Sequence, residues 1–164
     1  MSDAFIEHMV PVTPKLSDKL KKAGLIALTV LLVLAGVFVN GLLLIGAAAA
    51  VIACFVLFPR FNKEYEYSYV NGDIDISVIY SKESRRALDE MNLEQIECIA
   101  PLGSHHLDSY GDTFRTADYS SGDRADPVYV AVQGGSDKKK FLLCLSEEIL
   151  DDLRYRAPRK VFRD

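Results

Sequence analysis

The sequence predicts an α+β membrane protein, in which an N-terminal transmembrane helical hairpin precedes a small antiparallel β-sandwich or barrel of about seven strands. Three observations support this prediction. Residues 23–58 carry no charged side chain, strand-like alternation begins after Arg60, and a helix pattern begins at Ser146. The expected divisions are an N-terminal tail (1–18), the hairpin (19–58), and a β-rich domain (61–164) that ends with a C-terminal helix (146–157).

The apolar run is too long for a single membrane span. At about 1.5 Å per residue, one helix over residues 23–58 would be roughly 54 Å long, whereas the hydrocarbon core of a bilayer is roughly 30 Å thick. Asn40-Gly41 divides the run into two halves and favours a turn, because both residues tolerate positive φ. The sequence therefore predicts two spans, at about 19–39 and 42–58.

Small residues recur at helical spacing in the second span, at Gly46, Ala50 and Ala53. Such residues let two helix backbones approach closely. We expect them to pack against small residues of the first span, or, alternatively, to form a dimer face. The apolar run 23–58 contains no charged side chain, so no proton relay or ion path is predicted.

Basic residues flank the apolar run on both sides. Three lysines lie at positions 19, 21 and 22, Arg60 and Lys63 follow the run, and the turn between its halves carries no charge. The positive-inside tendency then places both termini in the cytoplasm and the turn outside. The predicted location is the inner (cytoplasmic) membrane, with two crossings, and the bilayer itself is the first expected partner.

The predicted domain is acidic. Residues 61–164 carry 20 acidic and 14 basic side chains. Phosphate would repel such a surface, so nucleic acid is not an expected partner and the domain as a whole is a poor binder of anionic lipid. A basic run, residues 138–140, could touch headgroups, but gatekeeping charges beside an apolar strand are the simpler interpretation.

The segment before the first span has two interpretations. Ser2–Val10 could form a short amphipathic turn with Phe5, Ile6 and Met9 on one side, or it could be a frayed end. Ser17 is the expected N-cap of the first span.

The strongest strand prediction is a β-hairpin. Tyr65, Tyr67 and Tyr69 alternate with polar residues, Asn71-Gly72 follows, and a second alternating run ends at Tyr80. The tyrosine row is either a half-buried strand face or a contact surface. Further expected elements are a third strand or short helix over Arg85–Met91, a strand ending near Pro101, and strands over Phe114–Tyr119, Val128–Gln133 and Lys139–Leu145.

One dense polar cluster stands out, formed by Ser104, His105, His106 and Asp108. Adjacent histidines diverge, and metal ligands usually come from separate elements, so no metal is predicted here. Three catalytic side chains from one short stretch rarely converge, so no catalytic residue and no cofactor is predicted either. The cluster, with Tyr110, is kept as a candidate interaction loop.

The layout resembles the pleckstrin-homology-like fold and, more closely, an uncharacterised family of small bacterial two-span membrane proteins, a domain of unknown function. The stretches that carry the second resemblance are 65–67 with 70–75, 99–102 with 105–110, 118–122, and 157–162. This resemblance implies the same topology and implies no activity, because no site residues are known for that family.

The first hypothesis is a membrane-anchored, non-catalytic cytoplasmic module that binds a protein partner or itself, through strand edges and the tyrosine-rich hairpin. The alternatives are a membrane-proximal enzyme using the His105/His106 loop, in a pocket with a second polar group from another strand, and an accessory subunit of a larger membrane complex.

Overall fold

The computed structural model describes residues 5–82, 84–111, 113–123, 125–135 and 137–163. The chain ends, residues 1–4 and 164, lie outside this description, as does the Arg60 side chain. The helices are α1 (Leu16–Phe38), α2 (Leu43–Phe61) and α3 (Glu147–Arg156), with a 3-10 turn η1 (His105–Leu107). The strands are β1 (Phe5–Pro11), β2 (Lys63–Val70), β3 (Asp73–Tyr80), β4 (Ser84–Asn92), β5 (Ile96–Pro101), β6 (Arg115–Asp118), β7 (Tyr129–Gln133) and β8 (Lys139–Leu143).

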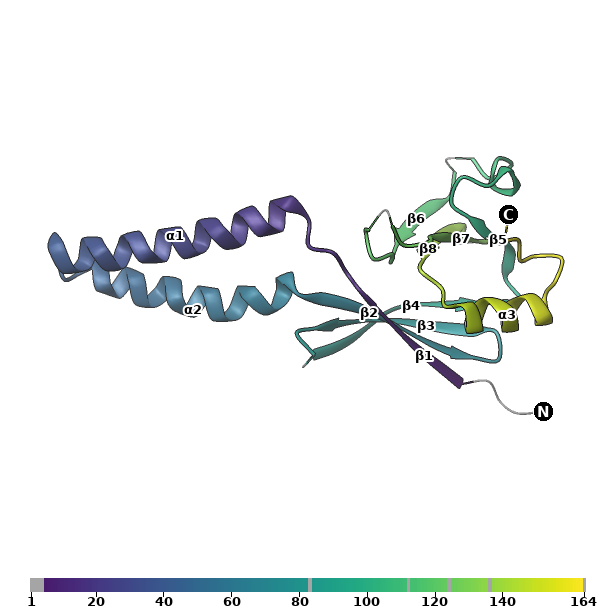
Figure 1. The fold of residues 1–164 in the computed structure, drawn as a ribbon, viewed down its shortest axis with the longest axis horizontal. Helices are drawn as coiled ribbons and strands as arrows, with labels where there is room; N and C mark the ends of the chain where they lie inside the picture. Colours follow the sequence, from purple (N-terminus) through teal and green to yellow (C-terminus); the bar gives the residue numbers. More distant parts are fainter. Residues whose placement is uncertain (1–4, 83, 112, 124, 136, 164) are drawn as a thin grey trace.

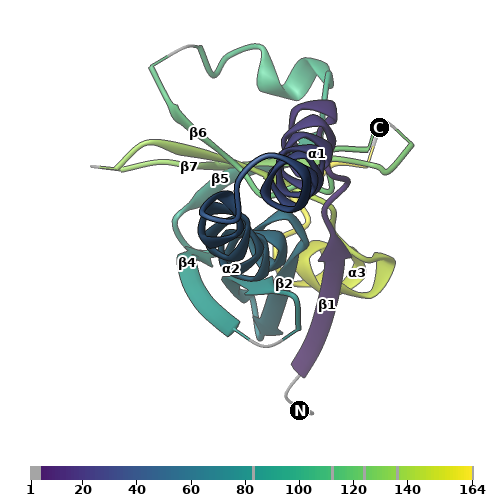
Figure 2. The ribbon, with the colours of Figure 1, turned by 90° about the vertical axis from the view of Figure 1, so that its left-hand side faces the viewer.

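The described strands form two separate four-stranded sheets and not one closed barrel. The first sheet has the order β1-β2-β3-β4 and the second has the order β5-β7-β8-β6. Figure 2, viewed along α1 and α2, shows the sheets as two layers. Residues 61–164 contribute seven of the eight described strands, β2 to β8, which agrees with the predicted number, and the eighth, β1, comes from the N-terminal tail. The prediction of purely antiparallel pairing is wrong, because β6 pairs with β8 in parallel.

The predicted hairpin over residues 65–80 is confirmed as β2 and β3, which pair along their whole length. Asn71 and Gly72 both have positive φ, 53° and 110°. A two-residue turn of this kind matches the right-handed twist of the flanking strands, and asparagine and glycine adopt it at little cost. Local sequence alone therefore specifies this part of the first sheet.

The N-terminal segment is a strand, which corrects both interpretations of residues 2–10 over their described part. β1 pairs antiparallel with β2 from Phe5 opposite Val70 to Pro11 opposite Glu64. The physical reason is that β2 would otherwise present an unpaired edge. Ser17 is also not the N-cap, because α1 begins at Leu16 and Lys15 occupies the cap position without a side-chain hydrogen bond.

The main core lies between the two sheets. Tyr67, Ile74 and Ile76 of the first sheet meet Ile99 and Phe141 of the second, and all five are fully buried. α3 contributes three more buried side chains: Ile149, Leu150 and Leu153.

The C-terminal helix is confirmed, and Ser146 caps it as predicted. The Ser146 hydroxyl accepts a hydrogen bond from the backbone N–H of Ile149 at 3.4 Å. Glu147 and Glu148 occupy the first turn, where negative charge is favourable. A local capping signal therefore locates the start of this helix.

Helices α1 and α2 lie antiparallel and project away from the sheets (Figure 1). We call them the helix pair. α1 follows β1 and α2 leads into β2, so the helix pair connects two neighbouring strands of one sheet. As a result, the two flanks of the apolar run are held side by side by the β1–β2 hydrogen bonds.

Candidate functional site

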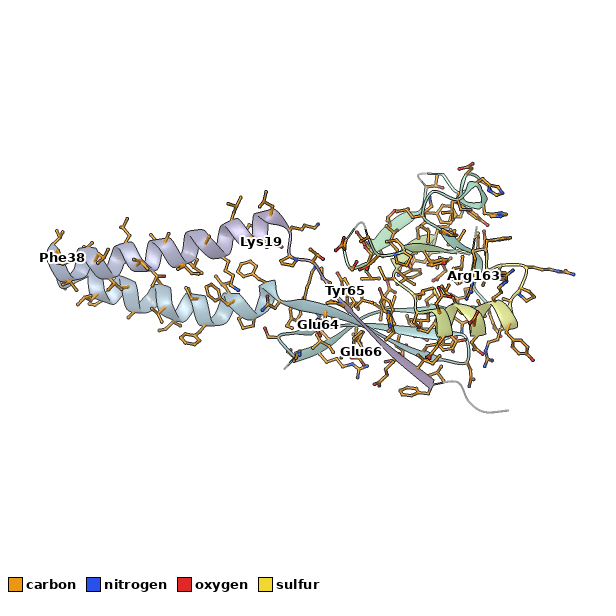
Figure 3. The ribbon with its side chains drawn as sticks, viewed as in Figure 1. Lys19, Phe38, Glu64, Tyr65, Glu66 and Arg163 are labelled. Carbon is orange, nitrogen blue, oxygen red and sulfur yellow. The ribbon has the colours of Figure 1, made fainter. Side chains whose placement is uncertain are left out.

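The outer surface of the helix pair is apolar. Gly36 is the one buried residue of α1, and many large hydrophobic side chains are exposed, including Leu31, Phe38, Val39, Ile45 and Phe55 at 63–81%. Figure 3 shows Phe38 at the free end of the pair and Lys19 near the end joined to the sheets. An exposed apolar surface of this size is unfavourable in water and marks a binding or membrane surface.

Among the described helices, α1 is long and apolar enough to cross a membrane, while the apolar part of α2, Leu43–Pro59, is shorter. α1 is therefore a candidate membrane span by length and composition. The second crossing stays a prediction.

The two helices meet through small residues, but not all of those predicted. A Cβ on Gly36 would lie 2.6 Å from Leu44 Cδ2, so the helices approach closely at this point. Ala47 is buried, whereas Ala50 and Ala53 are half-buried. Gly46 is exposed, with no atom within 4 Å of a Cβ built on it, so its predicted packing against the first span is wrong.

A hydrogen-bonding contact also joins the helices. The Thr29 hydroxyl donates to the Leu25 carbonyl at 2.8 Å and lies 3.7 Å from Cys54 Sγ. The hydroxyl is therefore satisfied within its own helix, as an apolar environment requires.

The tyrosine row of β2 lies in the core. Tyr67 and Tyr69 are fully buried and Tyr65 is 8% exposed. The Tyr69 hydroxyl donates to the Asp152 carboxylate of α3, and burial, reinforced by that carboxylate, raises the pKa of Tyr69. The row therefore stabilises the domain, and the expectation that these rings form an exposed contact surface is corrected.

The Ser104–Tyr110 segment is packed on the second sheet. His106 stacks on Phe162 with ring centroids 3.7 Å apart, and the Ser104 hydroxyl accepts a hydrogen bond from the His106 N–H. Tyr110 covers a small second core, and burial raises its pKa. His105 and Asp108 are exposed.

The neighbours of the two histidines bear on the enzyme hypothesis. Among the described residues, no acidic side chain hydrogen-bonds to either histidine ring, and no group of three His, Cys, Asp or Glu side chains is placed to hold a metal ion. The contacts that the segment makes, the His106–Phe162 stack and the packing of Tyr110 on the second core, place it over the second sheet.

Two lysines of the basic run 138–140 form contacts within the domain. Lys139 forms ion pairs with Asp89 and Asp137, at 3.3 and 3.1 Å. Lys140 Nζ donates to the Tyr110 carbonyl at 2.6 Å. These contacts tie the strand ends together, in agreement with a structural role for the lysines.

A hollow of about 900 Å³ opens where the helix pair joins the sheets. We call it the junction hollow. Its walls are the linker after β1, the first turn of α1, the end of α2 and the adjoining ends of β2, β3 and β4. Its charged side chains are Lys15, Asp18, Lys63 and Arg86, and Tyr80 and Ser84 add hydroxyls.

Backbone hydrogen bonds fix the linker that forms one wall. The Val12 N–H donates to the Lys63 carbonyl at 3.2 Å, and the Thr13 N–H donates to the Ser121 carbonyl at 2.8 Å. The linker that leads to Lys15 is therefore held by the first residue of β2 and by the loop between β6 and β7. In the sequence, Lys63 stands out only as a charge that flanks the apolar run. The sequence does not reveal the hollow, because the three cations of the hollow come from segments that are far apart in the chain.

The chain matches the family described as a bacterial PH-like domain, DUF6106, over residues 2–163. Comparisons with curated proteins and with solved structures find no match. The two sheets and the C-terminal helix are compatible with a PH-like fold, and the resemblance noted in the sequence is confirmed. Because the match covers nearly the whole chain, the protein belongs to this bacterial PH-like family of unknown function.

Proposed function

We propose that the protein is a membrane-anchored, non-catalytic interaction module, in which the helix pair crosses the inner membrane twice and holds the PH-like domain at its cytoplasmic face. The observation that carries the proposal is the β1–β2 pairing. Since β1 precedes α1 and β2 follows α2, the pairing of these neighbours supports a topology in which both flanks of the apolar run lie in one compartment. In this topology the apolar helix pair enters the bilayer as a hairpin that crosses it and returns to the same side.

The dimensions support two crossings. Each charge-free half, 23–39 and 42–58, is 17 residues long, or roughly 25 Å as a helix, near the lower end of what spans a hydrocarbon core of roughly 30 Å. Lys22 marks the boundary, because its Nζ lies 5.1 Å from the centre of the Phe58 ring. A lysine in this place can extend toward the headgroups while its stem stays against apolar residues.

For the domain, we propose a protein partner, or a second copy of the chain, on the outer face of the first sheet. Phe5 and Val70 lie opposite each other on this face, and Met9 lies on the same face of β1. They are 62%, 39% and 54% exposed. Clustered exposed apolar side chains are more informative than scattered ones.

Cysteine labelling in whole cells tests the anchoring. Asn40→Cys places a thiol at the turn of the helix pair, and Tyr155→Cys places one on the domain at a side chain that is 86% exposed. We expect a membrane-impermeant maleimide to label the first variant in intact cells and the second only after permeabilisation. The native Cys98 and Cys144 are buried, and the unmodified chain gives the background.

Two results would contradict the proposal. Equal labelling of both variants in intact cells would place the turn and the domain on one side. Labelling of Asn40→Cys only after detergent extraction would show that the turn ends within the bilayer.

A photo-crosslinking amino acid at Met9 tests the partner surface. We expect it to capture a specific membrane-associated product or a dimer, whereas the same probe at Tyr155 should not. Equal products from both positions would exclude the outer face of the first sheet as a selective contact.

A further inference from the structure

Three cations from three separate chain segments meet in the junction hollow. Lys15 is the last residue before α1, Lys63 is the first residue of β2, and Arg86 lies in β4. The strand register explains two of these positions. Tyr65, Val78 and Arg86 lie in one row across the first sheet, and Lys63, Tyr80 and Ser84 lie in the next row on the same face.

These cations have no carboxylate partner among the described residues. The ion pairs of the described chain involve other basic residues, and the contacts of Lys63 Nζ are with the Tyr65 hydroxyl at 3.4 Å and the Tyr65 ring. Asp18 is the one carboxylate in the lining, so the hollow carries an excess of two positive charges. Unpaired cations around a concavity favour an anionic ligand.

The first sheet is polarised along its strands. β4 carries Arg85 and Arg86 at the end near the helix pair, and Asp89 and Glu90 farther away. β3 carries Asp73 and Asp75 at its far end. Glu64 and Glu66 of β2 also lie at the end near the helix pair, and Glu66 pairs with Arg85 at 3.0 Å, so Lys63 and Arg86 are the strand cations of the hollow that have no ion-pair partner among the described residues. In the proposed function, this end of the first sheet faces the bilayer.

In the proposed membrane topology, the junction hollow lies at the level of the lipid headgroups. Lys15 precedes the charge-free run by eight residues, or roughly 12 Å along the α1 axis. The headgroup layer begins where the hydrocarbon core ends, and a lysine side chain adds several ångströms of reach. Val56 and Pro59 of α2 supply an apolar wall on the membrane side.

We infer that the junction hollow binds the phosphate of an anionic phospholipid from the cytoplasmic leaflet, with Lys15, Lys63 and Arg86 around the phosphate and the hydroxyls of Tyr80 and Ser84 available to the headgroup. This inference rests on the proposed function, because the lipid must lie beside an inserted helix pair. The domain as a whole is acidic, so the inference places its lipid contact at the junction hollow, where three cations lie together.

Lipid binding to the full-length protein tests the inference. The protein is released from detergent into native mass spectrometry with phosphatidylglycerol or phosphatidylcholine, and the two binding constants are compared. We expect phosphatidylglycerol to bind at least tenfold more tightly. Because each cation near an anionic headgroup contributes roughly fivefold in affinity, Lys15→Gln, Lys63→Gln and Arg86→Gln together should lower that affinity by about a hundredfold.

A matched control removes three cations elsewhere. Lys138→Gln, Arg154→Gln and Arg159→Gln change the net charge equally at exposed positions outside the hollow, and should leave the preference intact. Lys63→Arg with Arg86→Lys keeps the charge and should retain binding, which separates lost recognition from lost folding. Equal binding of the two lipids, or equal losses in the two triple variants, would overturn the inference.

Soluble anions identify the source of the phosphate. Inorganic phosphate and glycerol 3-phosphate are added as competitors, and we expect neither to displace phosphatidylglycerol at millimolar concentration. Displacement by inorganic phosphate at low micromolar concentration would overturn the lipid assignment, because the hollow would then be a site for free phosphate. The labelling of Asn40→Cys tests the proposed function separately. If that labelling shows insertion into the membrane but the two lipids bind equally, only the lipid inference is contradicted.

Discussion

The hydroxyl of Tyr67 in β2 donates a hydrogen bond of 2.6 Å to the backbone carbonyl of Tyr119 and thereby links the two sheets. The same oxygen accepts a longer hydrogen bond, 3.4 Å, from the backbone N–H of Cys144, just after β8. Burial raises the pKa of Tyr67 above its ordinary value, so the hydroxyl keeps its proton and remains a donor. One side chain therefore satisfies two backbone groups that directly follow β6 and β8.

Tyr67→Phe should destabilise the domain. The ring still fills the core, but the Tyr119 carbonyl and the Cys144 N–H each lose a partner in a buried place, which costs roughly 1–3 kcal/mol. The measurement is urea unfolding of the detergent-solubilised protein, followed by tyrosine fluorescence. Tyr155→Phe makes the same chemical change at an exposed residue and should leave the midpoint unchanged. Equal midpoints for the two variants would show that the hydroxyl of Tyr67 is not important for stability.

Asp152 should make stability depend on pH. Burial raises the pKa of this carboxyl, but hydrogen bonds from Tyr69 and Arg156 outweigh burial together and hold the pKa below its ordinary value. A group with a depressed folded pKa stabilises the fold above its unfolded pKa of about 3.9, and that contribution is lost as the pH falls through the folded pKa. Asp152→Asn should therefore cost about 1–2 kcal/mol at pH 7 and progressively less below pH of about 4.

Unfolding midpoints at pH 7, 5, 4 and 3 check this dependence. Asp151→Asn is the matched control. The Asp151 side chain is 71% exposed, and among the described residues its carboxylate bonds only to Arg163. A constant difference between wild type and Asp152→Asn across this range would show that the effect is one of packing and not of protonation.

Sequence was most informative where structure is local. The Asn71-Gly72 turn and the Ser146 cap depend on a few neighbouring residues, and both were predicted in place. β1 was missed because its partner, β2, follows only after the helix pair, and seven residues do not distinguish strand from helix periodicity. The parallel pairing of β6 with β8 also depends on distant segments.

The candidate site shows the same limit. The alternating tyrosines correctly indicated a strand, but the alternation could not show that the second sheet covers their face. The other face of β2 is also partly buried, since Glu66 is 5% exposed and bonds to Arg85 at 3.0 Å. The junction hollow combines residues 15, 63 and 86, and no spacing rule brings such positions together.

The close approach at Gly36 gives a test of the helix pair. Gly36→Leu should push α1 and α2 apart, because even a Cβ there would overlap the Leu44 side chain. In a Thr29→Cys background, the new thiol faces Cys54, and we expect rapid disulfide formation under mild oxidation. Adding Gly36→Leu should slow this reaction several-fold, as measured by a maleimide gel shift.

Gly46→Leu is the control for the helix pair, because a side chain at Gly46 meets open space. It should leave the disulfide rate unchanged. If instead Gly46→Leu slowed the reaction and Gly36→Leu did not, the contact face of α2 would be the one that the spacing of Gly46, Ala50 and Ala53 originally suggested.

The strand assignment of β1 predicts a difference between adjacent residues. Val10 is 3% exposed and packs in the core, whereas Met9 is 54% exposed on the outer face. Val10→Asn would bury an amide without a partner and should lower the free energy of unfolding by about 2–4 kcal/mol, while Met9→Asn should change it by about 0.5 kcal/mol or less. Urea unfolding of the two variants beside wild type measures both effects.

A larger loss of stability in Met9→Asn than in Val10→Asn would favour the amphipathic turn. In that turn Phe5, Ile6 and Met9 share one side, so Met9 would be the buried position. The result also bears on the proposed membrane topology, in which the β1–β2 pairing holds the two flanks of the helix pair together. Loss of the β1–β2 pairing in Val10→Asn should therefore loosen the constraint on the flanks. Labelling of Asn40→Cys in that background then tests whether the helix pair keeps its hairpin insertion without the support of the sheet.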